Sequence, residues 1–521
     1  MDIKKDFLSV LPAERIILDD LQGRYGASTI CASVSVAGAL KPVSVAEIQA
    51  ITKIANQKNY KLYPISTGRN WGYSDSLPVE NDNIILDLSL MNKILHYDAE
   101  LGSVTVEPGV TQQQLADYLK DHGDVHLASV TGSSPLTSIV GNYLERGFGL
   151  SPVYDHAQAV TCLEAVLADG SLYQSILSSL GCAEIDRLYR HGIGPYMDGL
   201  FFQSSMGIVT SMTIALARRC ESAAFIFAEA NENNIAVILN HLREIREKWG
   251  AGGLSIKCFN NFYTLAGMHV PYPEAYLDQK SALPENEAQD LFRRHKVSDY
   301  LITVTFCGPA VVAKGIVKNI RQDIKHISQK FIVIDDFKYA VAQKLKKFLP
   351  QFMQQKISIV ESIRSYINGI PSVEGLGFAY WRMGRMPDSS GDVHPAREGC
   401  GVIWYAPVLP FSEKSFRAFG RMVLEICPQY GINPLYNVTN YSGNYFVGLV
   451  PILFNKNMQA EEARACYMHL FEEGIKRGFA PYRLPSFAMS NVFSADSLAS
   501  KIRRVVDPGD IIAPGRYKGS M

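Results

Sequence analysis

The sequence has no excess of either charge: 51 lysine and arginine residues balance 51 aspartate and glutamate residues. A chain without net charge has no long-range field to attract nucleic acid or an anionic membrane surface. The sequence also has no charge-free run of about 18 apolar residues, the length that a membrane-spanning helix needs. Its start, MDIKKD, lacks the apolar core of a signal peptide. These absences predict a cytoplasmic protein that binds neither nucleic acid nor membrane.

Cysteine is present without a pattern. The nine cysteines include no CxxC pair, and their number is odd. Disulfide-stabilised domains and zinc sites usually have paired cysteines at short, regular spacings. The sequence therefore predicts reduced thiols, no disulfide framework and no metal site.

Four common signatures of nucleotide-binding and hydrolytic enzymes are missing: GxGxxG before a helix, GxxxxGK[ST], GxSxG and HExxH. Their absence argues against a Rossmann dehydrogenase, a P-loop NTPase, an α/β-hydrolase and a zincin. The chain has 521 residues, more than one hydrophobic core usually supports, so two or more domains are expected. The glycine-rich segments that are present need a different nucleotide-binding fold.

Helix and strand signals alternate along the first 220 residues. Residues 1–30 are expected to be helical. Ser44, with Glu47 three residues later, predicts the N-terminus of a helix with apolar residues at helical spacing. Thr111 predicts the start of another helix, through Leu119. Short apolar runs between turn residues predict strands at 60–65, 83–88, 102–107, 160–167 and 207–216.

One segment after the first of these strands is a candidate anion site: Ser66-Thr67-Gly68-Arg69-Asn70. Gly68 permits a tight turn and a close approach of the backbone to a ligand. Successive N–H groups and two hydroxyls can surround a pyrophosphate, with Arg69 supplying charge. The alternative is an ordinary strand and turn with a surface arginine. A second stretch of small and hydroxyl residues, 131–142, offers another surface for a flat or phosphorylated ligand.

The pattern changes near residue 220. Between residues 221 and 475, helical stretches at 235–248, 313–329 and 412–430 alternate with strands at 300–306, 402–405 and 446–453. This alternation predicts an inserted second domain. Glycine and proline return at residues 507–516.

Further short motifs follow the first one along the chain. In order they are STGRN at 66–70 with Gly72-Tyr73, VEPGVT at 106–111, Gly141-Asn142 with ERG at 145–147, Gly194-Pro195 with Asp198-Gly199, Gly207-Ile208, WYAP at 404–407, Tyr482-Arg483, and Asp507-Pro508 with IAPGR at 512–516. Each motif is weak alone. As an ordered set over most of the chain they resemble the vanillyl-alcohol-oxidase family of flavoproteins, and within it the para-cresol methylhydroxylase branch.

The resemblance implies an α+β, two-domain flavoprotein fold of the vanillyl-alcohol-oxidase and PCMH type. Residues 1–220 would form the FAD-binding domain and residues 221–475 a cap domain with a large antiparallel sheet. Residues 476–521 would return to the FAD domain. The implied FAD contacts are Ser66, Thr67, Gly68, Arg69, Asn70, Gly132, Ser133, Ser138, Val140, Gly141, Asn142, Gly147, Ile208 and Arg516.

The resemblance also implies a site for a para-substituted phenol. Tyr73, Tyr482 and Arg483 match two tyrosines and an arginine that hold a phenolate oxygen in this branch. A phenol has a pKa near 10, and a buried cation with two O–H donors favours the anion. The anion would release a hydride from its benzylic carbon to the flavin, leaving a quinone methide. The alternatives are a core aromatic role for Tyr73 and an internal ion pair for Arg483.

Glu145 occupies the position of an acidic residue near the flavin, usually an aspartate. The resemblance implies that Glu145 acts as a base toward substrate or water; the alternative is a structural ion pair with Arg146 or another cation. A glutamate is longer than an aspartate, and Asn444-Tyr445 replaces a His-His pair that is usual in the branch. These departures favour a larger or unusual substrate, from a specialised biosynthetic route or an aromatic degradation pathway.

His394 is a candidate for covalent attachment of the flavin. Counted back from WYAP, it falls where para-cresol methylhydroxylase has its flavin-linking tyrosine. A histidine ring nitrogen can form such a bond. The alternative is a loop histidine beside non-covalent FAD.

Two other functions are kept open. One is a flavin oxidase of the same fold that acts on a non-phenolic alcohol, amine or hydroxy acid. The other is a flavin-binding protein without turnover. For the phenol oxidase or dehydrogenase, the resemblance implies a homodimer with oxygen or an electron-transfer protein as the electron acceptor.

Overall fold

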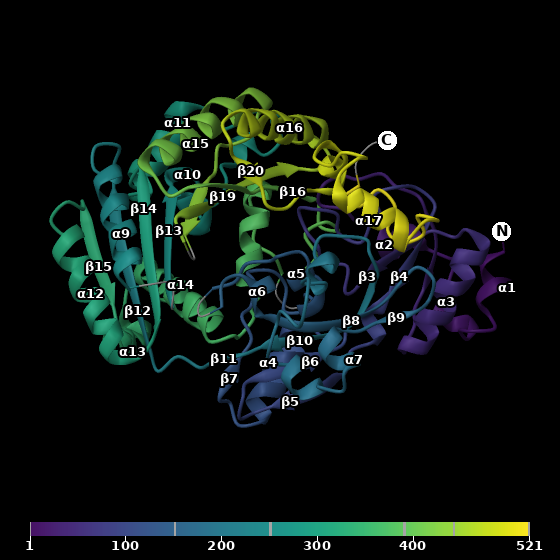
Figure 1. The fold of residues 1–521 in the computed structure, drawn as a ribbon. Coiled ribbons are helices and arrows are strands. Elements are labelled where there is room, and N and C mark those ends of the chain that lie inside the picture. Colours follow the sequence, from purple (N-terminus) through teal and green to yellow (C-terminus); the bar gives the residue numbers. More distant parts are fainter. Residues whose placement is uncertain (1, 151–152, 250–252, 389–391, 441–442, 519–521) are drawn as a thin grey trace.

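The structure is a computed structural model that describes residues 2–150, 153–249, 253–388, 392–440 and 443–518. Figure 1 shows two smaller sheets on one side of the molecule and one large sheet on the other. The strands of the smaller sheets all precede Ser222, where the first strand of the large sheet begins. The site described below lies where these two groups of elements face each other.

The first sheet has four strands in the order β1-β2-β4-β3, of which β2, β4 and β3 run parallel. Helix α3 (Val45–Lys58) packs on it, with Ile48, Ile51 and Ala55 in a shared apolar core. Helix α3 begins as predicted, because the Ser44 hydroxyl accepts a hydrogen bond from the Glu47 N–H at 3.3 Å. The strands are β1 (Ile16–Ile17), β2 (Val36–Leu40), β3 (Leu62–Ile65) and β4 (Asn83–Asp87).

The second sheet is antiparallel, with five strands in the order β5-β6-β10-β8-β9. Helix α4 (Gln112–Asp121) buries Leu115 and Leu119 against it, and the Thr111 hydroxyl caps the helix as predicted. The strands are β5 (Ile94–Asp98), β6 (Ser103–Val106), β8 (Val160–Val166), β9 (Leu172–Tyr173) and β10 (Ile208–Ala215); β7 (His126–Leu127) and β11 (Ala217–Arg218) form a separate pair.

The large sheet has nine strands and is antiparallel throughout. Its order is β15-β12-β14-β13-β18-β19-β17-β20, and β16 also pairs with β19. The strands are β12 (Ser222–Ala230), β13 (Leu254–Asn260), β14 (Tyr300–Gly308), β15 (Lys330–Ile334), β16 (Cys400–Tyr405), β17 (Pro407–Pro410), β18 (Asn437–Asn440), β19 (Tyr445–Asn455) and β20 (Ala480–Pro481).

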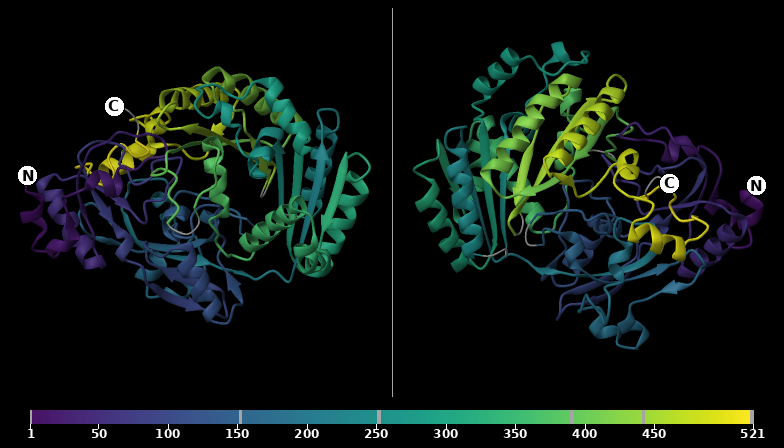
Figure 2. Two further views of the ribbon diagram at one scale, coloured as in Figure 1. Left: turned by 180° about the vertical axis from the view of Figure 1, so that it is seen from behind. Right: turned by 45° about the horizontal axis from the view of Figure 1, so that its top comes forward.

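Helices cover both faces of the large sheet. The main core lies on its outer face, beneath α9 (Ile235–Trp249), α12 (Ala310–Ile324), α15 (Glu413–Ile426) and α16 (Ala460–Lys476). Figures 1 and 2 show α14 (Gln351–Ile367) on the inner side, toward the two smaller sheets. Further helices here are α10 (Asn261–Gly267), α11 (Glu285–His295), α13 (Asp336–Leu345) and the 3₁₀ segment η6 (Glu374–Met383).

The C-terminal segment returns to the first sheet, as both views in Figure 2 show. Ile512 pairs with Leu62 in a parallel bridge, so residues far apart in the sequence extend the edge at β3. The preceding helix is α17 (Leu498–Val506). The short helices of the N-terminal part are α1 (Ile3–Phe7), α2 (Leu21–Tyr25), α5 (Ile139–Leu144), α6 (His156–Ala159), α7 (Ile176–Ser179) and α8 (Ala183–Asp186).

Gly72 and Trp404 join the two groups of elements. Gly72 has a φ of 81°, and a Cβ there would overlap the Trp404 indole of β16. The backbone N–H of Trp404 also donates to the Gly72 carbonyl at 3.3 Å. Only glycine combines this backbone conformation with so close a neighbour.

Two sequence predictions need correction. Residues 1–30 contain α1, α2, a 3₁₀ turn and strand β1 rather than a continuous helical lead-in. Cys220 and Cys307 form a disulfide, with Cα atoms 5.5 Å apart, so the prediction of reduced thiols fails for this pair. Their approach across 87 residues follows from the pairing of β12 with β14, which spacing in the sequence does not reveal.

Two absences concern the described residues. Among them, no group of three or more histidine, cysteine, aspartate or glutamate residues has the arrangement to hold a metal ion. None of their helices combines the length and the apolar character that a bilayer crossing requires. The predicted domain limits at residues 220 and 475 remain a proposal; the nearest element boundaries are Ser222 and Lys476.

Candidate active site

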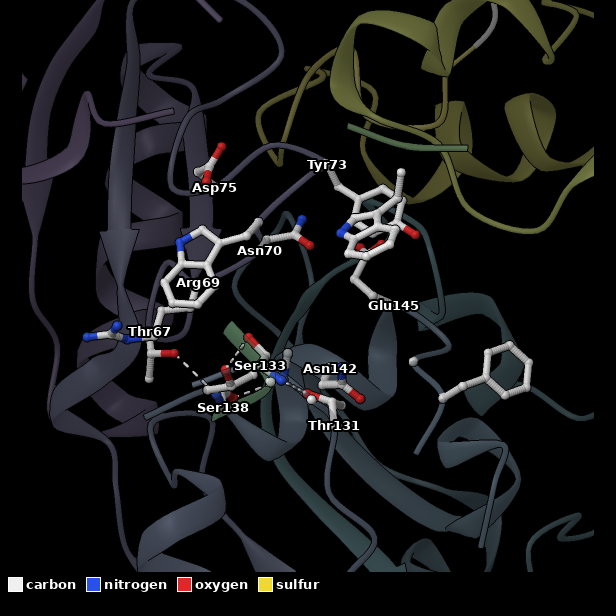
Figure 3. A pocket seen from close by; sticks show the side chains of 18 of the residues that line it. Thr67, Arg69, Asn70, Tyr73, Asp75, Thr131, Ser133, Ser138, Asn142 and Glu145 are labelled. Carbon is white, nitrogen blue, oxygen red and sulfur yellow. Dashed lines mark hydrogen bonds between the residues drawn. The ribbon is translucent and has the colours of Figure 1, made fainter. Parts of the chain in front are cut away.

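A cavity of about 1040 Å³ lies between the smaller sheets and the large sheet. Its walls come from the loop after β3, the segment 131–148, the strands β16 and β19, and the C-terminal residues 482–516. Cavities of this size that bind ligands often lie between domains. Figure 3 shows hydroxyl groups gathered at one end and Tyr73 with Glu145 at the other.

The loop Ser66–Asn70 forms one wall, directly after β3. Gly68 has a φ of 68°, which permits the turn, and its carbonyl accepts a hydrogen bond from the Ser76 hydroxyl at 3.2 Å. The Arg69 side chain is largely buried and pairs with Asp392 at 2.7 Å. One of its terminal nitrogens, Nη1, is buried and has no partner among the described residues. A cationic N–H group therefore remains available at this wall.

The segment 131–142 faces this loop. The Ser138 N–H donates to the Thr67 hydroxyl at 3.2 Å (Figure 3), and the Thr137 hydroxyl donates to the Ser133 hydroxyl at 3.0 Å. Gly132 lines the cavity, and no described heavy atom beyond its chain neighbours lies within 4 Å of the position a Cβ would take. The backbone at Gly132 therefore borders open space that a ligand can occupy.

His156 fixes the orientation of Asn142 in this wall. Burial lowers the pKa of His156 to about 3, so its ring is neutral. Its Nδ1–H donates to the Asn142 Oδ1 atom at 2.5 Å. Since the amide oxygen of Asn142 is occupied in this way, its NH₂ group is free to donate into the cavity.

Tyr73, Tyr482 and Arg483 come together at the other end. The guanidinium carbon of Arg483 lies 4.0 Å from the centre of the Tyr73 ring, a cation–π contact. The two tyrosine hydroxyls are hydrogen-bonded to each other, and burial raises the pKa of both. Both hydroxyls therefore keep their protons at neutral pH and can donate hydrogen bonds.

Glu145 lies between two arginines. Its carboxylate pairs with Arg483 at 3.1 Å and with Arg516, and it accepts a hydrogen bond from the Tyr517 hydroxyl at 3.3 Å. The side chains of Glu145 and Arg483 are only 7% and 9% exposed. Arg146, the neighbour considered as a partner from the sequence, is not the residue that pairs with it. Two guanidinium groups and one carboxylate leave one excess positive charge at this end.

Further hydrogen bonds hold these groups in place. Arg483 donates to Asn70 Oδ1, and the Asn70 amide donates to the Ser74 hydroxyl at 2.8 Å. Arg516 donates to the Tyr63 hydroxyl at 3.0 Å. Asn70 belongs to the loop that forms the first wall and Tyr63 to the strand β3 before it, so these hydrogen bonds connect the two ends of the cavity.

Asp75 anchors the loop that carries Tyr73. Its buried carboxylate accepts hydrogen bonds from the Thr29 N–H at 2.8 Å, the Thr29 hydroxyl at 3.0 Å and the Ser28 hydroxyl at 3.2 Å. Burial raises the pKa of Asp75 to about 7. The fixed position of Tyr73 therefore depends on contacts with the N-terminal segment.

Most residues named from the sequence line this one cavity. They are Ser66, Thr67, Gly68, Arg69, Asn70, Tyr73, Gly132, Ser133, Ser138, Val140, Gly141, Asn142, Glu145, Gly147, Tyr482, Arg483 and Arg516. Ile208 is not among the described lining residues: its side chain is buried in the core of the first sheet, while Gly207 and Val209 face the cavity. Because side chains alternate along a strand, Ile208 points away.

His394 also does not belong to the described lining. Its ring packs edge-on against Trp71 with the ring centres 5.5 Å apart, and Pro395 lines the cavity instead. Burial lowers the pKa of His394 to about 4. The side chain on which the hypothesis of a covalent bond rests thus packs against Trp71, a lining residue, and is not itself part of the described lining.

Sequence reasoning missed several residues of the site. Tyr63 and Tyr517 hold Arg516 and Glu145, and His156 orients Asn142. The cap contributes Tyr263 and residues of α14 to the lining. None of these has a local signature, since their role depends on contacts between distant segments.

Comparisons with known proteins give similarity in sequence and in fold. A family model described as an FAD binding domain matches residues 36–175. The 1'-carboxy-chondrochloren decarboxylase of Chondromyces crocatus is 32% identical over 492 residues, covering 92% of this chain and 90% of that protein. The 4-cresol dehydrogenase [hydroxylating] flavoprotein subunit of Pseudomonas putida is 25% identical over 494 residues, covering 92% and 87%. A solved structure of p-cresol methylhydroxylase with substrate bound matches at a TM-score of 0.86 and 22% identity, covering 99% of this chain and 96% of that one.

Proposed function

From the premise that this chain belongs to the vanillyl-alcohol-oxidase and para-cresol methylhydroxylase family of FAD-dependent oxidoreductases, we propose that it oxidises a para-substituted phenol at the benzylic carbon. The observation that carries the proposal is the meeting of Tyr73, Tyr482 and Arg483 at one end of the cavity. Two O–H donors and a guanidinium group form a site for a phenolate oxygen.

The cavity fits FAD, the cofactor of this family. The open space beside Gly132 and the unpartnered Arg69 Nη1 atom suit a pyrophosphate, which backbone N–H groups and a cation would hold. The hydroxyls of Ser66, Thr67 and Ser133, with the Asn142 amide, would complete the cofactor site. FAD supplies a two-electron acceptor that can take up a hydride.

We expect the cofactor to be non-covalent, because the His394 ring contacts Trp71 and Asn70 has no nucleophilic group for a bond. Acid precipitation of the fully loaded protein should leave the yellow colour in the supernatant. Flavin that stays in the pellet of the wild type, and moves to the supernatant in His394→Ala, would contradict this expectation and establish the bond to His394.

Residues at the phenol end would activate the substrate. Tyr73 and Tyr482 donate hydrogen bonds to the substrate oxygen, and Arg483 stabilises its negative charge. The electron density of the phenolate weakens the benzylic C–H bond. When a hydride leaves, the oxygen electrons move into the ring and the substrate becomes a neutral quinone methide. Water can then add to its exocyclic carbon, or a proton can be lost to give an alkene.

Glu145 is proposed to position the arginines. Its carboxylate is paired with Arg483 and Arg516 and accepts a hydrogen bond from the Tyr517 hydroxyl, so it holds the two guanidinium groups together. In this proposal Glu145 holds Arg483 over the Tyr73 ring, while a role as a base toward substrate or water stays the expectation from the resemblance.

The test is anaerobic reduction of the loaded protein by 4-ethylphenol. We expect the flavin absorbance to bleach with 4-ethylphenol and to stay unchanged with 4-ethylanisole, which has no ionisable oxygen. Bleaching by both compounds, or only by alcohols, amines or hydroxy acids, would support the alternative oxidase. A protein that binds FAD but bleaches with none of these donors would be a flavin-binding protein without turnover.

A second candidate is oxidative loss of a carboxylate from a phenolic acid. The 32% identical relative is a decarboxylase, and the Glu145 cluster has one excess positive charge that suits an anionic substrate. With 3-(4-hydroxyphenyl)propanoate, hydride loss from the benzylic carbon gives a quinone methide. The electrons of the adjacent C–CO₂⁻ bond then restore the phenolate, releasing CO₂ and leaving 4-vinylphenol. Release of CO₂ in the same anaerobic experiment would favour this reaction over hydroxylation.

The electron acceptor remains a prediction from the resemblance, with oxygen and an electron-transfer protein as the two options. The homodimeric state and the cytoplasmic location are proposals of the same kind. The homodimeric state rests on the family alone, and the cytoplasmic location rests on the sequence features given in the first subsection.

A further inference from the structure

The cavity continues into the cap beyond the residues that would hold FAD and a phenol ring. Five of its lining residues come from one helix, α14: Gln354, Ser358, Ile359, Ser362 and Ile363. None of them belongs to the sequence motifs shared with the family. The extension of the cavity along α14 is called the α14 arm below.

Helical geometry explains why these residues share a face. Gln354, Ser358 and Ser362 are spaced by four residues, and Ile359 and Ile363 lie next to them. Another side of the helix carries Val360 and Ile367, which form an apolar cluster with Ala223 and Phe225 of β12; Ile363 also packs against this cluster. Because that side is fixed on the large sheet, the helix presents Ser358, Ser362 and Ile359 to the cavity, with Ile363 at the border between the cavity and the cluster.

A second group of lining residues in the cap is mostly apolar and is held in place by neighbouring side chains. Tyr263 of α10 packs on Phe378 of η6 with the ring centres 4.6 Å apart, and it is hydrogen-bonded to Asn437 of β18. Met268 follows in the same wall. The arm therefore has one apolar wall and one wall with hydroxyl groups.

Among the described residues that line the arm, the charged and ionisable ones are at its edge. Lys346 is paired with Glu361 at 2.8 Å, and Glu374 and His269 are exposed to solvent. An anionic or cationic tail would find no dedicated partner inside the arm. The exposed residues indicate that its outer end reaches the surface.

The length of the arm sets the size of its occupant. From Gln354 to Ile363 the helix advances roughly 13 Å, the length of about four residues of extended chain. A substituent of one or two carbons, as on a simple alkylphenol, would leave this space to water.

We propose that the α14 arm binds a long, uncharged para substituent of the phenolic substrate, a linear chain with a hydrogen-bonding group such as an amide. The inference rests on the proposed phenol oxidation. The ring lies at Tyr73, Tyr482 and Arg483, the apolar part of the tail packs on Ile359, Ile363 and Tyr263, and the amide bonds to Ser358 or Ser362. These serines determine specificity without touching the reacting carbon.

The test compares a series of phenols with the FAD-loaded enzyme. One set has linear para-alkyl chains of two to eight carbons, and the other has a 2-aminoethyl group acylated with chains of two to six carbons. Binding is measured by the change in flavin absorbance on addition of each phenol, and kcat/KM by flavin reduction. Each added methylene should tighten binding about threefold to fourfold until the arm is filled.

Bulky variants then locate the tail. Ser358→Phe and Ser362→Phe should lower the ratio of kcat/KM for long over short phenols at least tenfold, because the new ring fills the arm. Ser365→Phe is the matched control: Ser365 lies on the same helix, donates to the Glu361 carbonyl at 3.1 Å, and is outside the described lining. This control should keep the wild-type ratio.

Four outcomes would overturn the inference. Affinity that does not rise with chain length would mean that the arm is only an entry route. A loss of the long-to-short ratio in Ser365→Phe equal to that in Ser358→Phe would mean a general disturbance of α14. If short phenols reduce the flavin but long ones do not, the proposed role of the α14 arm is contradicted while the proposed phenol oxidation stands. If no phenol perturbs or reduces the flavin, both proposals are contradicted.

Discussion

Replacing Arg483 by methionine should slow flavin reduction by 4-ethylphenol by about 10²–10³-fold, the usual cost of removing one stabilising donor from an active site. Methionine keeps much of the side-chain length but has no charge. The phenolate oxygen would then have only two neutral donors, and the unionised phenol would be favoured. Rapid mixing under anaerobic conditions measures the rate directly.

Arg483→Lys separates charge from geometry. A lysine keeps the positive charge but lacks the planar group that stacks on Tyr73 and bonds to Asn70 and Glu145. We expect an intermediate rate, and a flavin spectral shift with a phenolate inhibitor that is reduced in Arg483→Lys and abolished in Arg483→Met. Equal rates in wild type and Arg483→Met, with normal FAD content, would contradict the role given to this arginine.

Glu145→Ala should lower the free energy of unfolding by about 3–5 kcal/mol, because it leaves one buried and one partly buried guanidinium group without their shared carboxylate. The repulsion between Arg483 and Arg516 would also displace Arg483 from Tyr73. The measurement is urea unfolding of the FAD-loaded protein, with refolding checked on dilution.

Glu473→Ala is the matched control for this change. Glu473 also pairs with two cations, Lys476 and Arg477, but it does so at the surface of α16. Its loss should change stability little, since solvent screens exposed pairs. Acetate or formate should partly restore Glu145→Ala by binding between the arginines and should not affect the wild type. A stability loss no greater than that of the control would show that the cluster is not held by Glu145.

Local signals in the sequence predicted much of the secondary structure. Ser44 and Thr111 cap helices as expected, and the strand expected at residues 446–453 is β19. These features depend on neighbours a few residues away, so a single sequence reveals them. The expected helical lead-in at residues 1–30 was wrong because Ile16–Ile17 pairs with β2, a contact outside the local pattern.

The site could be predicted only where a motif carries it. The loop 66–70 and the pair Tyr482-Arg483 were found through an ordered set of motifs, and the structure brings them to one cavity. The partners of Glu145 could not be predicted, because Arg483 and Arg516 are more than 330 residues away in the sequence. The same holds for the α14 arm, whose residues form an ordinary amphipathic helix when viewed without the cavity beside it.

The contact between Gly72 and Trp404 has a consequence for protein engineering. The Trp404 indole occupies the position that a Cβ at residue 72 would take. The residue at position 72 and the residue at position 404 must therefore fit each other. A chimera that joins the N-terminal half of this chain to the cap of a relative therefore needs an indole, or a smaller side chain, at the position of Trp404. Recombination points are best chosen so that residues 70–76 and β16 come from the same parent.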